Sequence, residues 1–229
     1  MSATSDGKRL FLGVRVSVAT ANALAQCAEQ LARRANDAKL EIKWALPTSY
    51  HVTLKFLGWT RSDAINRVRD AAQAALAGTS PFRFRTSRLG AFPALEKANV
   101  VWAGVEPSSL GELADKLDRA MTGIGFAAEK RAFVAHVTLG RLRETRPVRD
   151  VVLPMSEQMF SETRVDHVIL YESETKPSGS VHNEIARIDF KQPISAENRQ
   201  TGAVELGDTE TDDGWPRGST GEPHGDGDQ

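Results

Sequence analysis

The chain has very little of what marks a membrane, secreted or fibrous protein. Its 229 residues include one cysteine, Cys27, which cannot form a disulfide within the chain and fits a reducing compartment. No apolar run approaches the roughly 20 residues of a membrane-spanning helix, because the best candidate, Leu10–Val18, contains Arg15. The polar start, Met1–Lys8, lacks the small-residue cleavage site of a secretory signal. These absences predict a cytoplasmic protein without a membrane partner.

Several motifs of cofactor-dependent enzymes are also missing. The sequence has no G-x-x-x-x-G-K loop and no G-x-G-x-x-G turn, so binding of ATP or NAD has no support. It has no H-E-x-x-H or C-x-x-C pair for zinc and no nucleophile elbow for Ser-His-Asp catalysis. The composition, 40% hydrophobic and 26% charged, is that of a soluble globular protein. We therefore expect a globular chain with no cofactor and no metal.

The net charge of −1 conceals an uneven distribution along the chain. Residues 196–229 contain two basic and nine acidic residues, a balance of −7, whereas residues 1–195 contain 27 basic and 21 acidic residues, a balance of +6. The last stretch is rich in glycine and poor in large apolar residues, which predicts a disordered tail. We expect a flexible N-terminus over 1–8 and a single domain over 9–195. The basic domain suits an anionic partner such as RNA, or is an ordinary solvated surface.

Hydrophobic periodicity predicts strands alternating with helices in this domain. Helical spacing follows Thr20, and it recurs over Arg61–Ala77, Leu110–Met121 and Val148–Phe160, the last interrupted by Pro154. Strand patterns cover Leu10–Val18, Ile42–Leu46, His51–Leu57, Phe82–Ser87, Asn99–Val105, Phe133–Leu142, and a final pair, Arg164–Tyr171 and Val181–Phe190, around a turn at Lys176–Gly179. Because many of these strands show one polar face, the pattern favours an α+β fold.

One tetrapeptide, His-Val-Thr-Leu, occurs twice, at His51–Leu54 and His136–Leu139. Strand alternation places each histidine on the same face as the threonine two residues later, and the valine and leucine on the other face. The order of elements around the two copies is similar, which predicts two related lobes that face each other.

Two opposed imidazoles can act as general base and general acid on one phosphate, because a pKa near 6.5 allows one to be neutral and the other protonated. Thr53 and Thr138 can donate hydrogen bonds to phosphate oxygens, and Arg141 can add positive charge. A structural pair of histidines and a zinc site are the alternatives.

The residues that surround these motifs resemble a known family. Lys43–Gly58 and Phe133–Arg141 are similar to the two motifs of the two-histidine (2H) phosphoesterase superfamily, and within it to RNA 2′,3′-cyclic phosphodiesterases, also called LigT-like 2′–5′ RNA ligases. The likeness extends more loosely from Arg9 to Phe190. It implies a bilobal α+β fold, with two pseudo-symmetric lobes of antiparallel sheet and helices around a central cleft.

The resemblance also implies an activity and a set of roles. The implied activity is metal-independent hydrolysis of a terminal RNA 2′,3′-cyclic phosphate to a 2′-phosphomonoester, with reversible 2′–5′ ligation. His51 is then the general acid and His136 the general base, Thr53, Thr138 and Arg141 bind phosphate, and Phe56 lies near the terminal base. An ideal strand would turn Phe56 to the face opposite His51, so this role needs a twist or a bulge after Leu54.

The sequence departs from the family pattern at two positions and leaves two other functions open. Ala135 stands where the family usually has proline, and His182 stands where a tyrosine is frequent. The alternatives are a 2H phosphodiesterase for a small cyclic phosphate, such as that of ADP-ribose, and a binding module without catalysis. A basic strip at Arg83, Arg85 and Arg88 would favour long RNA. Nothing in the sequence requires more than a monomer.

Overall fold

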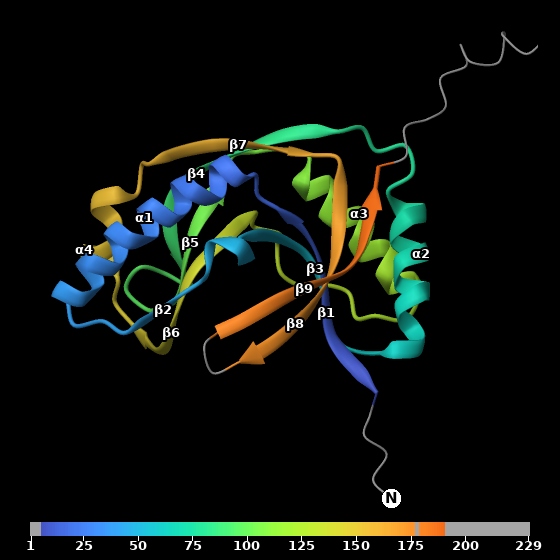
Figure 1. Ribbon diagram of the computed structural model, residues 1–229, viewed down its shortest axis with the longest axis horizontal. Helices are drawn as coiled ribbons and strands as arrows, with labels where there is room; N and C mark the ends of the chain where they lie inside the picture. Colours follow the sequence, from blue (N-terminus) through green and yellow to red (C-terminus); the bar gives the residue numbers. More distant parts are fainter. Residues whose placement is uncertain (1–5, 177–178, 191–229) are drawn as a thin grey trace, which may run out of the picture. The chain divides into compact units, whose positions relative to one another are not determined.

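The computed structural model describes residues 6–176 and 179–190, which belong to one compact unit (Figure 1). Its helices are α1 (Val18–Asp37), α2 (Ile65–Ala75), α3 (Leu110–Gly123) and α4 (Arg149–Val152). Its strands are β1 (Gly7–Arg15), β2 (Ile42–Trp44), β3 (His51–Arg61), β4 (Phe82–Phe92), β5 (Ala98–Val105), β6 (His136–Arg146), β7 (Met159–Val165), β8 (His167–Lys176) and β9 (Gly179–Asp189). The predicted tail from Ala196 and the turn at Pro177–Ser178 lie outside the described residues.

The described strands form one antiparallel sheet in the order β7-β4-β5-β6-β3-β1-β8-β9, with β2 paired to β6. The sheet has two halves. One half contains β3, β1, β8 and β9, side by side in that order. The other half contains β6, β5, β4 and β7, also in that order. The halves meet where β3 and β6 pair at Val52 and Val137. The α+β class and the antiparallel sheet agree with the prediction from the sequence.

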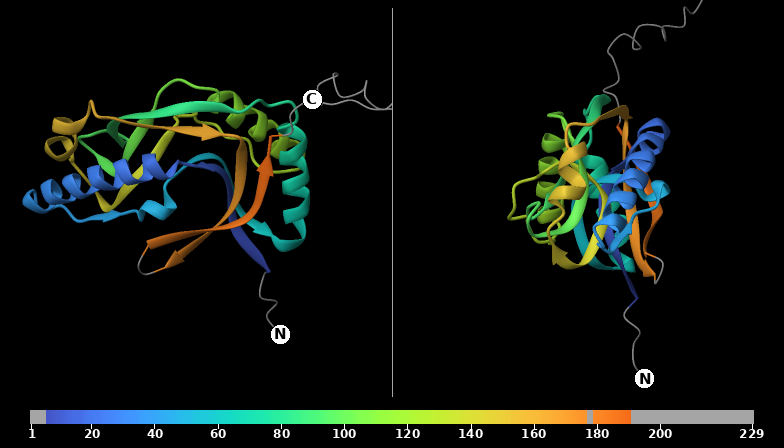
Figure 2. Two further views of the ribbon diagram at one scale, coloured as in Figure 1. Left: turned by 45° about the horizontal axis from the view of Figure 1, so that its top comes forward. Right: turned by 90° about the vertical axis from the view of Figure 1, so that its left-hand side faces the viewer.

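A strand-helix-strand unit occurs in each half. The first is β1-α1-β3, with the short β2 between α1 and β3, and the second is β5-α3-β6; each ends in a strand that begins with His-Val-Thr-Leu. The helices exchange partners, since α1 packs against β7 of the other half and α3 packs against β3. Figures 1 and 2 show the long α1 along β7 and the pair α2–α3 at the opposite end of the sheet. Each of these helices packs against the half of the sheet to which it does not belong, so the two halves share one hydrophobic core.

The helix α1 illustrates how the local sequence sets these elements. Ser17 caps its N-terminus, because the Ser17 hydroxyl accepts a hydrogen bond from the backbone N–H of Thr20. Leu24 and Leu31 recur at helical spacing and are fully buried. Each such leucine contributes about 2 kcal/mol through burial.

Two of the predicted elements are wrong. The chain over Val148–Phe160 is helical only in α4 and in a short 3-10 turn at Leu153–Met155, after which β7 begins. Pro154 lacks the N–H that a continuing helix needs, and the strand then gains backbone hydrogen bonds by pairing with β4. The predicted strand Arg164–Tyr171 is in fact the end of β7 and the start of β8, which belong to opposite ends of the sheet.

The predicted end of the strand at Gly58 is also wrong. The strand β3 continues to Arg61, and Gly58 takes a left-handed conformation with φ +70° inside it. The helix expected from Arg61 consequently begins later, at Ile65, after a 3-10 turn at Ser62–Ala64. A glycine in this conformation serves a bulge as readily as a turn, and the sequence alone does not distinguish the two.

No helix among the described residues is long and apolar enough to cross a membrane.

Candidate active site

The two His-Val-Thr-Leu segments lie at the start of β3 and of β6, where the halves of the sheet meet. In both copies the valine and leucine are buried in the core, while the histidine and threonine are partly exposed on the other face. The antiparallel pairing of Val52 with Val137 sets His51 on the side of Thr138 and Thr53 on the side of His136. The four polar side chains therefore occupy one face across the junction, as the repeat predicts.

Both histidine rings are held by the same backbone interaction. The Nδ1–H of His51 donates to the carbonyl oxygen of Ser49 at 2.7 Å, and the Nδ1–H of His136 donates to that of Val134, also at 2.7 Å. Each acceptor lies two residues before its histidine. With Nδ1 carrying the hydrogen, Nε2 of each neutral ring has a lone pair that can accept a hydrogen bond or a proton. The Thr53 hydroxyl lies 3.1 Å from Nε2 of His51.

Burial and positive neighbours oppose protonation of these rings. Burial is the largest of the causes that together lower the pKa of His51 to about 4; the Ser49 hydrogen bond raises this pKa, and the nearby His182, His136 and Arg141 lower it. Burial and Arg141 also lower the pKa of His136. Both imidazoles are therefore neutral at pH 7 in the free protein. A bound anion would reverse part of this effect, because its negative charge favours the protonated ring.

A bulge resolves which way Phe56 faces. The register of β1 with β3 pairs Leu12 with Lys55 and Gly13 with Thr53, so Leu54 is the extra residue of a bulge. Beyond it the faces are exchanged: Phe56 lies on the histidine face and is 60% exposed. The structure thus contains the bulge that this role of Phe56 requires.

The same bulge recurs in the second copy and places Arg141. The register of β5 with β6 skips Leu139, which is the extra residue of this bulge. Arg141 therefore lies on the same face of β6 as His136 and Thr138. Arg141 acts electrostatically on His51, His136 and His182. Phe56 and Arg141 are each the fifth residue after their histidine, and so occupy equivalent positions in the two copies.

Three aromatic residues that the sequence analysis did not place at the site surround His51. The Phe11 ring centroid lies 4.8 Å from that of His51, Tyr171 lies 5.7 Å away, and His182 contacts His51 edge-on at 4.9 Å. They come from β1, β8 and β9, whose alignment with β3 could not be known from their sequences. The Nδ1 of His182 is buried and has no hydrogen-bond partner among residues 6–176 and 179–190. A hollow of about 450 Å³ has Ser49, Arg15 and His182 in its wall.

A buried lysine fixes β3 to the chain that leads into β6. Lys55 is 5% exposed, and its ammonium donates to Asp118 of α3 at 2.5 Å and to the carbonyl oxygen of Ala127 at 2.6 Å. Asp118 also accepts the backbone N–H of Glu129. This ion pair connects the strand of the first histidine to the segment before the second.

Other predicted features are engaged in ion pairs of their own. His167 donates from Nδ1 to Asp166 at 2.6 Å, at the start of β8. The arginines of the predicted basic strip on β4 are ion-paired, Arg85 with Glu162 at 2.8 Å and Arg88 with Glu157 at 3.6 Å. These carboxylates offset the positive charge on which the strip hypothesis depends. Among the described residues, no group of three or more His, Cys, Asp or Glu side chains could hold a metal ion.

Comparison with known proteins gives consistent results. The model of the 2′-5′ RNA ligase superfamily matches residues 21–177. An RNA 2′,3′-cyclic phosphodiesterase of Methanothermobacter thermautotrophicus is 30% identical over 152 residues, which are 65% of this chain and 82% of the relative. An RNA 2′,3′-cyclic phosphodiesterase of Archaeoglobus fulgidus is 31% identical over 146 residues, 63% of this chain and 81% of the relative.

Solved structures share the fold. A protein of Thermus thermophilus superposes with a TM-score of 0.68 at 22% identity, covering 80% of this chain and 98% of the other. Apo LigT of Escherichia coli gives a TM-score of 0.58 at 20% identity, covering 82% and 100%.

Proposed function

Because the chain belongs to the 2′-5′ RNA ligase superfamily, we propose that it hydrolyses a 2′,3′-cyclic phosphate at the 3′ end of RNA to a 2′-phosphomonoester. The observation that carries the proposal is the pair of histidines on one face of the β3–β6 junction. Each is held by the same Nδ1–H hydrogen bond, which leaves Nε2 for proton transfer. The names of the relatives support the cyclic phosphate as substrate.

The reaction divides the proton transfers between the two rings. His136 removes a proton from water through Nε2, and the resulting hydroxide oxygen attacks phosphorus. The P–O3′ bond breaks, and His51 gives its Nε2 proton to the departing 3′ oxygen. In 2′–5′ ligation an RNA 5′-hydroxyl takes the place of water.

The free protein presents both rings in the neutral state, so His51 must acquire its proton with the substrate. The anionic phosphate supplies the reason, because it raises the pKa of an adjacent imidazole. Thr53 and Thr138 donate hydrogen bonds to the phosphate oxygens, and Arg141 balances their charge. Phe56, exposed on the same face, stacks on the terminal base. The reaction needs no metal ion.

Two further features belong to this proposal. The site is composed of residues from one chain, so we propose that the protein acts as a monomer. We also propose a cytoplasmic location, since the single cysteine is a buried free thiol whose pKa burial raises to about 11.

The test uses a 5′-labelled RNA that ends in a 2′,3′-cyclic phosphate. Hydrolysis makes its terminal phosphate removable by a phosphatase, whereas the cyclic ester resists it. The same RNA with a 3′-phosphate is the control. Phosphatase-sensitive product at a rate far above buffer is the expected result. Turnover confined to a small cyclic phosphate such as that of ADP-ribose, or binding without turnover, would replace the proposal with one of its alternatives.

A further inference from the structure

The histidine face of β3 carries a second exposed aromatic residue beyond Phe56. Trp59 is 59% exposed, nearly as much as Phe56. The two are three residues apart, which would put them on opposite faces of a regular strand. However, the register of β1 with β3 skips Leu57, which is the extra residue of a second bulge, and the neighbouring Gly58 has φ +70°. This second bulge returns Trp59 to the face of Phe56 and His51.

The neighbours of Trp59 on β1 suit a nucleic-acid strand. Its indole lies close over Gly7, where an added Cβ would come within 2.7 Å of Nε1. Its cross-strand partner is Arg9, an exposed residue for which no ion pair exists within residues 6–176 and 179–190. An exposed aromatic ring beside an unpaired guanidinium is the combination that binds bases and backbone of single strands without sequence preference.

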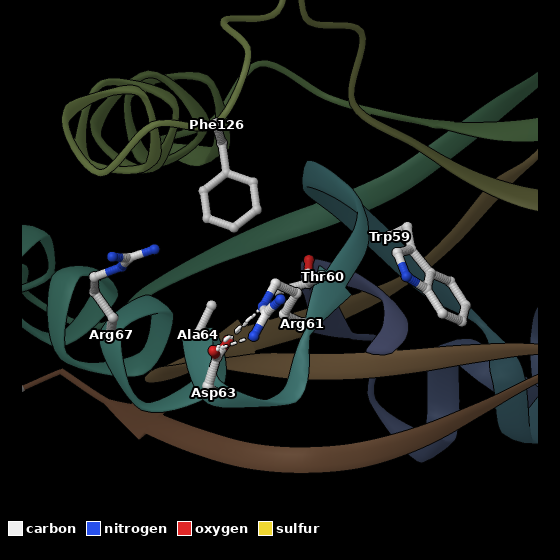
Figure 3. Close-up of a pocket in the computed structure, with 7 residues that line it drawn as sticks. All are labelled: Trp59, Thr60, Arg61, Asp63, Ala64, Arg67 and Phe126. Atoms are coloured by element: carbon white, nitrogen blue, oxygen red, sulfur yellow. Dashed lines mark hydrogen bonds and ion pairs between the residues drawn. The ribbon is translucent and has the colours of Figure 1, made fainter. Parts of the chain in front are cut away.

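A hollow at the end of β3 borders Trp59. It has a volume of about 470 Å³, and its lining includes Trp59, Arg61, Asp63, Arg67 and Phe126. Figure 3 shows the Trp59 ring directed away from Phe126 and Arg67. Trp59 therefore borders this hollow without filling it, and most of its surface stays exposed.

The spacing of the two rings agrees with successive nucleotides. Phe56 pairs with Phe11 and Trp59 pairs with Arg9, two residues along β1. Two residues of an antiparallel strand span about 7 Å, enough to separate two unstacked bases, one on each ring. The aromatic series thus leads from His51 through Phe11, whose ring lies 6.1 Å from that of Phe56, toward the end of β3.

We propose that Trp59 and Arg9 form a subsite for the penultimate nucleotide of the RNA, with the indole stacking on its base. The inference rests on the proposed function. The cyclic phosphate ends the RNA, so the rest of the chain must leave from the 5′ side of the terminal nucleoside. With the terminal base on Phe56 and the phosphate at the histidines, the continuation of β3 lies on the side away from the reacting groups. The natural substrate is then an oligonucleotide, not a mononucleotide.

The experiment compares two substrates of the same chemistry in wild-type and variant proteins. One is a nucleoside 2′,3′-cyclic phosphate, and the other is a dinucleotide that ends in it. We expect Trp59→Ala to leave kcat/KM for the mononucleotide unchanged and to lower that for the dinucleotide about tenfold through KM, as stacking energies imply. Trp59→Phe keeps a stacking ring and should retain most of the dinucleotide activity. Leu153→Ala, which truncates another exposed hydrophobic residue, is the matched control.

The contribution of the Arg9 charge to dinucleotide binding is measured separately, from the salt dependence of the affinity. Arg9→Gln should weaken dinucleotide binding and reduce the slope of log affinity against log salt by about 0.7, the value for one phosphate contact on a single strand. Equal losses for both substrates in Trp59→Ala, or no loss for either, would overturn the subsite. Failure of the wild-type protein on both substrates would instead overturn the proposed function.

Discussion

At the scale of single residues, the two histidines owe their orientation to the backbone two residues before them. Ser49 and Val134 are unlike in side chain, yet both accept the Nδ1–H of their histidine through a carbonyl oxygen at 2.7 Å. The tautomer therefore does not depend on a neighbouring carboxylate. The repeated motif and the backbone carbonyl group two residues before it therefore give both histidine rings the same tautomer.

The first prediction concerns these two rings. His51→Ala and His136→Ala should each lower kcat by about 10²- to 10⁴-fold, the range of general acid–base catalysis. Both side chains lie on the face opposite the buried valine and leucine and outside the hydrophobic core, so the circular dichroism spectrum and melting temperature should stay close to wild type. Near-normal turnover in either variant would contradict the two-histidine mechanism.

The residue scale is also where the sequence was most informative. His51, Thr53, His136 and Thr138 could be placed on one face because strand alternation holds over three residues without knowledge of the fold. Tyr171 and His182 could not, since their approach to His51 depends on which strands become neighbours.

At the scale of elements, paired bulges determine which side chains join the histidines. One extra residue at Leu54 and one at Leu139 exchange the faces of β3 and β6, and so bring Phe56 and Arg141 to the site. For β3 the sequence indicates that Phe56 needs a twist or bulge after Leu54, but periodicity could not show that a bulge forms there, because a bulge depends on the register with a partner strand. The same dependence on a partner explains why β7 was mistaken for helix.

Gly58 tests the second bulge of β3. A Cβ at Gly58 would meet nothing within 4 Å, so Gly58→Ala introduces only the strain of φ +70°. We expect it to destabilise the fold by about 1 kcal/mol in urea unfolding. Gly111→Ala in α3 also meets nothing within 4 Å but has helical geometry, and should stabilise by about 0.5–1 kcal/mol. Equal effects of the two substitutions would contradict the strained bulge.

The buried ion pair predicts an asymmetry between its partners. The Lys55 side chain is 4% exposed, whereas that of Asp118 is 26% exposed. Asp118→Ala leaves a buried ammonium without its carboxylate and should cost about 3 kcal/mol. Lys55→Met leaves a carboxylate that water can reach and should cost less. Chemical denaturation of both variants measures the difference, and a larger loss in Lys55→Met would refute this account of the pair.

At the scale of the whole molecule, the two strand-helix-strand units place equivalent functional groups from each half at one junction. Each half supplies a histidine, a threonine and, after the bulge, one further contact: an aromatic ring from the first and a guanidinium from the second. A cyclic phosphate ester is asymmetric in a similar way, because the nucleoside lies on one side of its phosphorus and the attacking water on the other. The duplication of the sequence motif predicted the two-part arrangement, while the shared sheet and exchanged helices emerged only from the structure.

The pH dependence of stability follows from the buried rings. The pKa of His51 is about 4 in the folded chain and 6.5 in its ordinary state, so the unfolded chain binds more protons between these values. The free energy of unfolding should therefore decrease as the pH falls from about 6.5 to about 4, by up to about 3 kcal/mol from this residue. Urea titrations of wild type and His51→Gln across this range measure the contribution. Identical pH profiles would exclude it.

The most direct test of the central claim is the product formed in EDTA from a short RNA with a 2′,3′-cyclic phosphate, identified by phosphorus NMR. The account predicts full turnover without a metal ion and a 2′-phosphomonoester as product, because His51 protonates the 3′ oxygen. A 3′-phosphomonoester, or turnover that EDTA abolishes, would contradict it.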